Sequence, residues 1–111
     1  MAISFKKLTN INFILFKILL SHYYKNNIVF KKPNDLLIDK KKICGILQET
    51  LFKRNKKYLI VGVGINLIKN PNIVNYQATN LFSQIKKKIS KQKMENQIKK
   101  IFELKLGKFY N

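Results

Sequence analysis

Apolar residues near the start of the chain recur at the three- and four-residue spacing of one helix face. Within residues 9–26 these positions are Ile11, Ile14, Leu15, Ile18, Leu19 and Tyr23. Residues three and four apart lie on one side of an α-helix, so the pattern predicts an amphipathic helix over this segment. Thr9 or Asn10 supplies the side chain expected at the N-cap of this helix.

Four β-prone runs follow, and polar segments separate them. The runs are residues 28–30, 36–38, 43–51 and 58–68. We expect turns at Pro33, at residues 39–41 and at residues 54–57. Gly45 lies inside the third run, where a glycine indicates a bulge or a close approach. Short polar turns between successive strands are typical of antiparallel sheets, so the pattern predicts a meander with the first helix packed on one face.

The last third of the chain returns to helical spacing after a loop at residues 70–72. A helix capped by Thr79 is predicted over residues 79–89, and a second helix over residues 91–105. The apolar positions of the second helix are Met94, Ile98, Ile101, Phe102 and Leu104. The order of helix, strands and helices predicts an α+β fold, an antiparallel β meander packed against helices. Residues 1–111 are short enough for one domain or part of one.

The strongly basic composition has two explanations. Among 111 residues there are 23 Lys plus Arg and 5 Asp plus Glu, which gives a formal net charge of +18. Such a charge is typical of proteins that bind nucleic acid or an anionic surface. However, Arg54 is the only arginine, and Lys, Asn, Ile, Phe and Tyr are abundant. An A/T-rich coding sequence would produce this profile, so we expect only nonspecific contact with nucleic acid.

Several common classes of site receive no support from the sequence. Cys44 is the only cysteine and His22 the only histidine, so we expect neither an internal disulfide nor a cysteine-based metal cluster. We interpret Cys44 as a small buried residue and His22 as a surface residue. Residues 11–20 are the most apolar stretch, but they are shorter than the ~18–20 residues that cross a bilayer, and Lys17 interrupts them. We therefore expect no membrane segment and a cytoplasmic protein.

Three clusters depart from the ordinary alternation of apolar and polar residues. They are Lys31 to Asp35, Lys42 to Leu47, and Gly62 to Asn66. Each has an ordinary explanation by itself: a turn, a solvated lysine, and glycines that serve packing. The pair Gly62 and Gly64 is also not a dinucleotide fingerprint, because the third glycine is missing. In a meander, however, the three clusters face one another, and glycines beside a cation suit a flat anionic ligand.

Taken in order, these clusters make the sequence resemble the biotin protein ligase family, within the biotin/lipoate ligase superfamily. That family carries K-W-P-N-D, then K-x-x-G-I-L-x-E, then G-x-G-I-N. The first motif is matched by Lys31, Pro33, Asn34 and Asp35, the second by Lys42, Gly45, Ile46, Leu47 and Glu49, and the third by Gly62, Gly64, Ile65 and Asn66. Residues 78–81 resemble the family's A-T-S-L stretch. The resemblance covers roughly residues 8–105 and implies a partial biotin/lipoate ligase-like domain.

The resemblance implies an enzyme that joins biotin to AMP using ATP and Mg²⁺ and then transfers biotin to a lysine of a carboxylase carrier domain. On that analogy Lys42 and Asp35 are the catalytic candidates. Lys42 would stabilise charge at the biotin carboxylate and the phosphate. Asn34 or Asp35 would orient or deprotonate the carrier lysine. The candidate residues for binding substrate and nucleotide are Lys31, Pro33, Asn34, Gly45, Gly62, Gly64 and Asn66, and no metal ligand is assigned.

Two departures from the family pattern bear on activity. Lys32 stands where the family has tryptophan, which puts one wall of the site in doubt. The family also carries an upstream loop of the form G-R-G-R-x-x-R-x-W that folds over biotin. A sequence with one arginine and no tryptophan does not contain that loop. We therefore expect a partial catalytic domain that lacks the biotin loop and the C-terminal barrel domain and is inactive alone. Its expected partner is another copy of the chain or a missing half of the enzyme.

Two alternatives remain open at the level of sequence. The first is a basic binding module that contacts nucleic acid or an acidic partner. The second is acyl transfer of the lipoate-ligase type, because that family shares the fold. The combination of K-P-N-D at Lys32 to Asp35 with G-I-N at Gly64 to Asn66 favours biotin.

Overall fold

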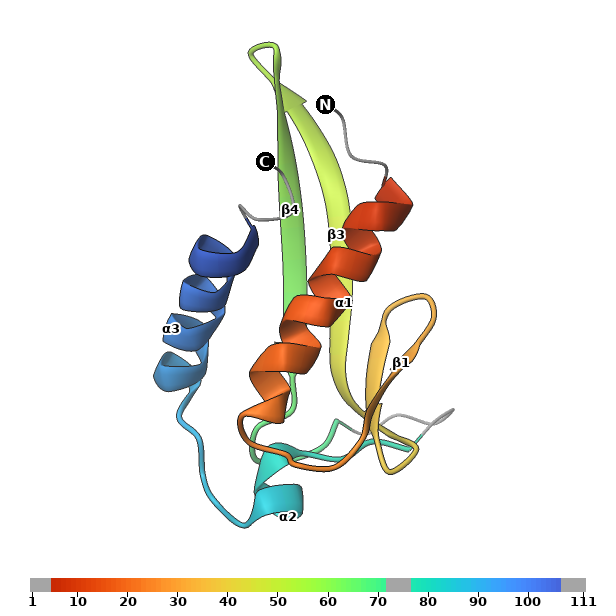
Figure 1. Ribbon diagram of the computed structural model, residues 1–111, viewed down its shortest axis with the longest axis vertical. Coiled ribbons are helices and arrows are strands. Elements are labelled where there is room, and N and C mark those ends of the chain that lie inside the picture. The colour runs from red at the N-terminus through yellow and green to blue at the C-terminus, as the bar shows by residue number, and fades with distance from the viewer. Residues whose placement is uncertain (1–4, 72–76, 107–111) are drawn as a thin grey trace.

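The computed structural model describes residues 5–71 and 77–106, which form a four-stranded sheet with helices on one side (Figure 1). In chain order the elements are α1 (Phe5–Ser21), β1 (Ile28–Lys31), β2 (Asp35–Ile38), β3 (Lys41–Lys53), β4 (Lys56–Ile65), α2 (Leu81–Ile85), α3 (Lys91–Ile101) and the π-helix η1 (Phe102–Leu106). The fold is α+β, as the sequence predicted. None of the described helices is long and apolar enough to span a membrane.

The sheet is an antiparallel meander with the strand order β1-β2-β3-β4. Two-residue turns join the last three strands, and both residues of each turn have positive φ: 52° and 62° at Asp39 and Lys40, 53° and 62° at Arg54 and Asn55. Turns of this kind match the right-handed twist of paired strands. Both turns are shorter than predicted. Because the tight turn needs only two residues, Lys41 already belongs to β3, and Lys56 and Lys57 belong to β4.

Helix α1 is offset from its predicted bounds. It already includes Phe5 and ends at Ser21, so Thr9 and Asn10 lie inside it and neither is the N-cap. The apolar face extends one turn upstream, because Leu8 is buried like Ile11. The side chain of Thr9 instead accepts a hydrogen bond from Gln48 Nε2 on β3. Gln48 also accepts from Asn12 Nδ2, and this polar contact aligns the buried Asn12 of α1 with β3.

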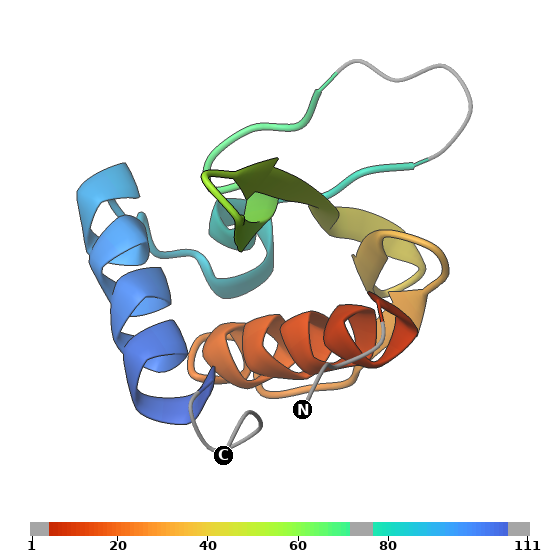
Figure 2. The ribbon, with the colours of Figure 1, turned by 90° about the horizontal axis from the view of Figure 1, so that it is seen from above.

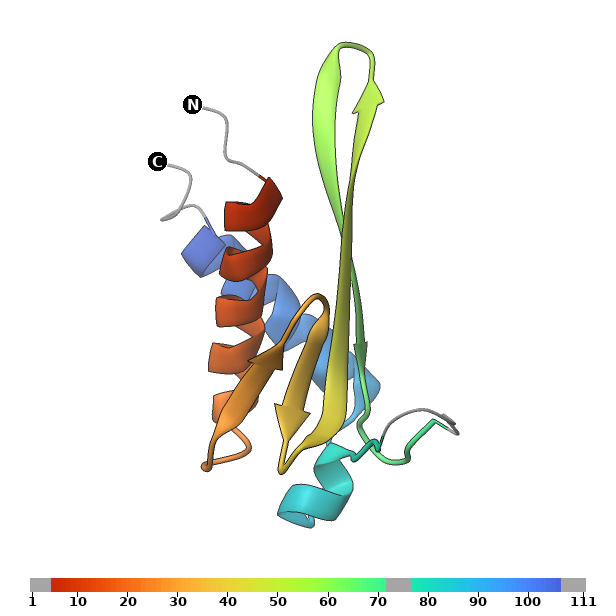
Figure 3. The same ribbon diagram turned by 90° about the vertical axis from the view of Figure 1, so that its right-hand side faces the viewer.

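The core lies between the sheet and the helices. Helices α1 and α3 cover the same face of the sheet, as the two rotated views show (Figure 2, Figure 3). The largest fully buried side chains of the core are Phe16, Leu15, Leu19, Leu20, Ile28, Leu36, Ile38, Ile43 and Leu81. Burial of such side chains supplies about 1.5–3 kcal/mol each, which is the main term that holds α1 on the sheet.

The C-terminal helices differ in detail from the predicted ones. Helix α2 covers only residues 81–85, and its N-cap is Asn80, whose side chain accepts a hydrogen bond from the Ser83 amide. Thr79 is not the cap, because its backbone amide is bound to the Lys42 carbonyl. Helix α3 begins after the cap Ser90 and continues into η1. In the predicted loop, Asn72 lies outside the described residues.

The other face of the β3–β4 hairpin carries no helix. Side chains alternate between the two faces of a strand. Gln48 contacts α1, so its neighbours Leu47 and Glu49 lie on the opposite face. Leu47 is 67% exposed and its diagonal neighbour Ile60 is 44% exposed. We call this side, with Leu47, Leu51, Tyr58 and Ile60, the open face.

Candidate functional site

A lysine and an aspartate form an ion pair at the base of the open face. Lys42 Nζ lies 2.9 Å from Asp35 Oδ1, and both side chains are about one-quarter exposed, at 23% and 24%. Asp35 is the first residue of β2, and it pairs with Gly45 of β3. The pair therefore lies where the β1–β2 turn meets the start of the longest strand.

A β-bulge sets the direction of the Lys42 side chain. Leu36 pairs with Cys44, whereas Leu37 pairs with Lys42, so Ile43 is an extra residue on β3. Ile43 and Cys44 are consecutive and both are buried, at 0% and 1% exposure. In a regular strand they would point to opposite faces. The bulge turns both toward the core and returns Lys42 to the open face, a typical use of bulges at sites.

Glycines make the floor beside this ion pair. Gly45 pairs directly with Gly64, and Gly62 pairs with Leu47. A Cβ added at Gly45 would lie 3.2 Å from both Cε and Nζ of Lys42, whereas a Cβ at Gly64 would have no atom within 4 Å. Gly45 is thus a close approach, as its position in the sequence indicated, but the group that approaches it is the lysine side chain. The bulge itself is at Ile43.

Two adjoining hollows flank Lys42. The first, of about 360 Å³, is the Asp35 hollow, lined by Asn34, Asp35, Lys42, Gly45, Ile46, Leu47, Gly62, Val63 and Gly64. The second, of about 270 Å³, is the Asn66 hollow, lined by Lys42, Cys44, Gly45, Gly64, Ile65, Asn66, Pro71 and Ala78. The sequence predicted that the three clusters face one another, with Lys42, Asn66 and the turn at residues 33–35 around one pocket. The structure has two hollows there, which share Lys42, Gly45 and Gly64. Asp35 lines only the first hollow and Asn66 only the second.

The Asn66 side chain makes hydrogen bonds that hold two backbone segments together. Its Nδ2 donates to the carbonyl of Thr79 at 3.0 Å and to that of Lys42 at 3.4 Å. The backbone of Lys42 is held from the same side, since its amide donates to Gln77 and its carbonyl accepts from Thr79. These contacts fasten residues 77–79 to the start of β3. The resemblance of residues 78–81 to a family motif gave no hint of this structural role, because hydrogen bonds between distant segments leave no local pattern.

Two other candidates lie beside the hollows. Lys31 is exposed at the end of β1 and pairs with Asp35 across the strands. Pro33 is exposed in the turn that follows, and the Lys32–Pro33 peptide bond is cis. Neither residue lines the two hollows. The backbone of the next residue, Asn34, accepts a hydrogen bond from the Ile46 amide, which fixes the turn against β3.

Cys44 is not placed to act as a nucleophile. Its thiol is buried, and this burial raises its pKa from 9.0 to about 12, although the charge of Lys42 lowers it in part. The thiolate is the reactive form of cysteine. His22 lines a different hollow, between α1 and α3. In residues 5–71 and 77–106 no three His, Cys, Asp or Glu side chains cluster as metal ligands.

The sequence around these residues matches the model of a known protein family. The model of the biotin/lipoate A/B protein ligase family matches residues 5–66, which is more than half of the chain. The chain belongs to this family. The match includes β1 to β4 and all nine residues singled out from the sequence. A comparison with curated protein sequences gave no match.

Solved structures of this family have the same fold. The apo biotin protein ligase of Aquifex aeolicus is 28% identical, with a TM-score of 0.71 over 95% of this chain and 48% of that one. The same enzyme in complex with biotin and ATP is 26% identical, with a TM-score of 0.68 over 86% of this chain and 40% of that one. P. falciparum LipL1 with lipoate is 17% identical, with a TM-score of 0.60 over 85% and 30%, and shares the fold. The chain spans about half the length of the Aquifex ligase.

Proposed function

We propose that this chain provides the carboxylate- and phosphate-binding wall of a biotin–protein ligase site, with Lys42 at its centre. The observation that supports this most directly is the Lys42 ammonium, which the bulge turns onto the open face above a glycine floor. A related ligase has been solved with biotin and ATP. The partner that this proposal implies is the carrier domain of a biotin-dependent carboxylase.

In the proposed reaction, a carboxylate oxygen of biotin attacks the α-phosphate of ATP, and pyrophosphate leaves. The amine of a carrier lysine then attacks the acyl carbon of biotinyl-AMP, and AMP leaves. Negative charge develops on phosphate oxygens in the first step and on the acyl oxygen in the second. A fixed cation beside these oxygens lowers both barriers. Lys42 is that cation, and Asp35 holds its ammonium in place before the ligands arrive.

The remaining candidates divide between contact and positioning. Gly45, Gly62 and Gly64 leave room for a flat ligand close to the backbone, and Leu47 offers it an apolar contact. Asn34 lines the same hollow, whereas Lys31 and Pro33 border it. Asn66 is a positioning residue, because its amide holds the backbone of Lys42.

The residues of this wall do not provide a set of ligands for the magnesium ion that the family uses. The carboxylate in the Asp35 hollow is already paired with Lys42. Mg²⁺ usually takes one or two carboxylates together with substrate phosphates. These residues therefore do not make a magnesium site by themselves.

The test is a titration of the chain with biotin and with ATP, followed by NMR. We expect amide shifts at residues 42–46 and 62–66, and at least about a tenfold loss of affinity in Lys42→Ala, the scale on which a charge-assisted contact acts. Lys40→Ala is the matched control, because Lys40 lies exposed in the β2–β3 turn. Unchanged binding in Lys42→Ala would remove Lys42 from the site. Tighter binding of lipoate than of biotin would assign the wall to the lipoate branch of the family.

A catalytic test places the chain in a complete ligase. Joined to the part of the Aquifex enzyme that it does not cover, the chain should form biotinyl-AMP, and Lys42→Ala should slow this step by about 10²–10³. A chimera that folds and binds ATP but is unaffected by Lys42→Ala would contradict the assigned role.

A further inference from the structure

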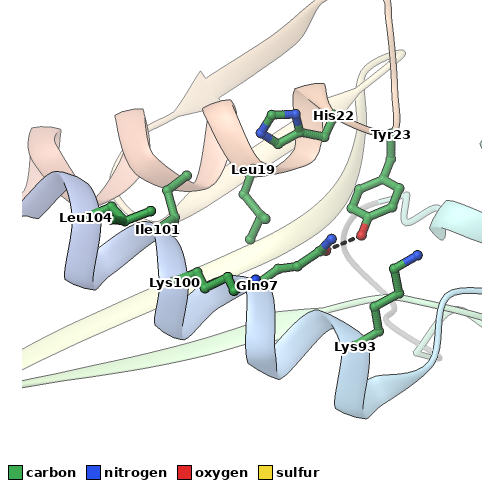
Figure 4. Close-up of a pocket in the computed structure, with 8 residues that line it drawn as sticks. All are labelled: Leu19, His22, Tyr23, Lys93, Gln97, Lys100, Ile101 and Leu104. Carbon is green, nitrogen blue, oxygen red and sulfur yellow. Dashed lines mark hydrogen bonds between the residues drawn. The ribbon is translucent and has the colours of Figure 1, made fainter.

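A separate hollow of about 470 Å³ lies between the C-terminal end of α1 and helix α3 (Figure 4). Its lining residues are Leu19, His22, Tyr23, Lys93, Gln97, Lys100, Ile101 and Leu104. Helices α1 and α3, which supply most of its lining, cover one face of the sheet (Figure 3). Lys42, in its ion pair with Asp35, lies on the open face. The proposed ligase function uses none of these residues.

The hollow has apolar lining residues, and two of its polar lining residues are joined by a hydrogen bond. Leu19 and Ile101 are buried, at 2% and 7% exposure, and both line the hollow. The Tyr23 hydroxyl donates to Gln97 Oε1 and joins the segment after α1 to α3 (Figure 4). This hydrogen bond joins side chains from the two segments that line the hollow.

Cations border the same space. Lys93, Gln97 and Lys100 are four and three residues apart, so they lie on one stripe of α3. None of the eight lining residues is acidic. The glutamate of α3, Glu95, lies 3.9 Å from Lys91 in an exposed ion pair and does not line the hollow. Lysine stems cover apolar surface while their ammonium groups stay at its border.

From this arrangement we propose that the hollow between α1 and α3 binds a small amphipathic organic anion. The ligand would have a compact apolar body, about the size of two fused rings, and one carboxylate, sulfonate or phosphate head group. The body would rest on Leu19 and Ile101, and the head group would accept hydrogen bonds from Lys93 and Lys100. Small-molecule sites are typically pockets of about 300–1,000 Å³ with a mainly apolar lining and a few polar groups.

The probe is naphthalene-2-sulfonate, and its binding is followed by NMR amide shifts. We expect shifts at residues 19–23 and 93–104. Methanesulfonate offers the head group alone and naphthalene-2-methanol the apolar body alone, so each should bind at least about tenfold more weakly. Equal binding of methanesulfonate, or shifts confined to the open face, would overturn the proposal.

The charge requirement is tested with two double variants of equal net charge. Lys93→Gln/Lys100→Gln should weaken binding of the probe about fivefold or more, since two partly exposed ionic contacts are lost. Lys53→Gln/Lys56→Gln removes the same charge at the tip of the β3–β4 hairpin and should leave the affinity unchanged. All four side chains are exposed, so both variants should fold. An equal loss in both variants would show that net charge alone attracts the probe, and this would refute the site.

Discussion

Gly45 decides whether Lys42 and Asp35 can meet. A Cβ at position 45 would lie 3.2 Å from Cε and Nζ of Lys42, which is tighter than an ordinary contact, so the end of the lysine side chain would have to shift. In Gly45→Ala we expect the ammonium to move, so that its distance from Asp35 exceeds the 2.9 Å of the ion pair and biotin binding weakens about threefold or more. Stability should change by less than about 1 kcal/mol, because the displaced atoms are the flexible end of a side chain. Crystal structures and biotin titrations measure both effects.

Gly64→Ala is the control for this prediction. Its added methyl meets no atom within 4 Å, so the ion pair should stay intact and the midpoint of urea unfolding should not fall. An intact ion pair in Gly45→Ala, or a displaced one in Gly64→Ala, would contradict the role assigned to Gly45.

The Cys44 thiol should be unreactive in the folded protein. Burial raises its pKa from 9.0 to about 12, so the thiolate fraction at pH 8 is about a thousandfold below that of the unfolded chain. Iodoacetamide should label Cys44 slowly in buffer and rapidly in concentrated urea, as mass spectrometry would record. Equal labelling rates in buffer and in urea would be incompatible with a buried thiol.

The raised pKa of Cys44 makes the folded protein less stable as the pH rises. Because the folded state disfavours the thiolate, the stabilising contribution is complete below pH 9.0 and is lost as the pH rises toward 12. Across that window the free energy of unfolding should fall with a slope of up to about 1.4 kcal/mol per pH unit from this group. Cys44→Ala lacks the titration, so its slope should be smaller by that amount.

At the scale of elements, Asn66 follows β4, and its side chain connects the start of β3 with residues 77–79 by hydrogen bonds. Asn66→Asp removes the amide that donates to two carbonyls and places carboxylate oxygens against them. We expect a loss of about 2–3 kcal/mol in the free energy of unfolding, measured in urea at pH 7. Asn70→Asp is the control. Asn70 is exposed, and water can replace its hydrogen bond to the Ala78 carbonyl, so its loss should stay below about 1 kcal/mol. Equal losses would mean that Asn66 has no special place in the structure.

The sequence predicted the elements better than their ends. The meander and the helix on its face could be predicted from the apolar spacing, because packing a helix against a sheet requires apolar residues at these positions. The cap at Thr9 was wrong, because a side chain that suits an N-cap also suits a contact with Gln48 across the fold. Thr79 was wrong for a related reason: Asn80 accepts from the Ser83 amide, while the Thr79 backbone pairs with Lys42. Such choices depend on distant partners, and a local pattern does not contain them.

The candidate site shows the same limit. Motif order predicted that Lys42, the glycines and the turn before β2 come together. Gly45 indicated a bulge or a close approach in this run, but not that the extra residue is Ile43, because an extra residue on one strand is visible only against its partner strand. The division into two hollows also depends on where the lysine side chain lies.

At the scale of the whole molecule, the open face limits what the 111 residues achieve by themselves. Lys42 and the glycine floor form one wall, and Leu47 and Ile60 remain exposed on the same side. An acyl-adenylate on an uncovered wall is open to hydrolysis by water. We therefore expect the isolated polypeptide, with ATP, Mg²⁺, biotin and a carrier domain, to place no biotin on the carrier lysine at enzyme-like rates.

Mass spectrometry of the carrier domain is the measurement, and the Aquifex ligase under the same conditions is the positive control. ATP-dependent transfer at a comparable rate would show that the site is closed in another way. The exposed apolar strip of the open face also predicts association with a second polypeptide that covers it.

The contacts of Lys42 with residues 77–79 also impose an order on synthesis. A ribosome releases the chain from its N-terminal end, so β1 to β4 emerge before the segment that binds the start of β3. Gln77 and Thr79, which bind the amide and the carbonyl of Lys42, emerge later, and so does the Thr79 carbonyl that Asn66 binds. The strands and the Lys42–Asp35 ion pair can form early, whereas the hydrogen bonds from residues 77–79 to the Lys42 backbone form only after residue 79 has been made. A nascent chain that ends before residue 79 would contain Lys42 and the three glycines, but not the hydrogen bonds from residues 77–79 to the Lys42 backbone.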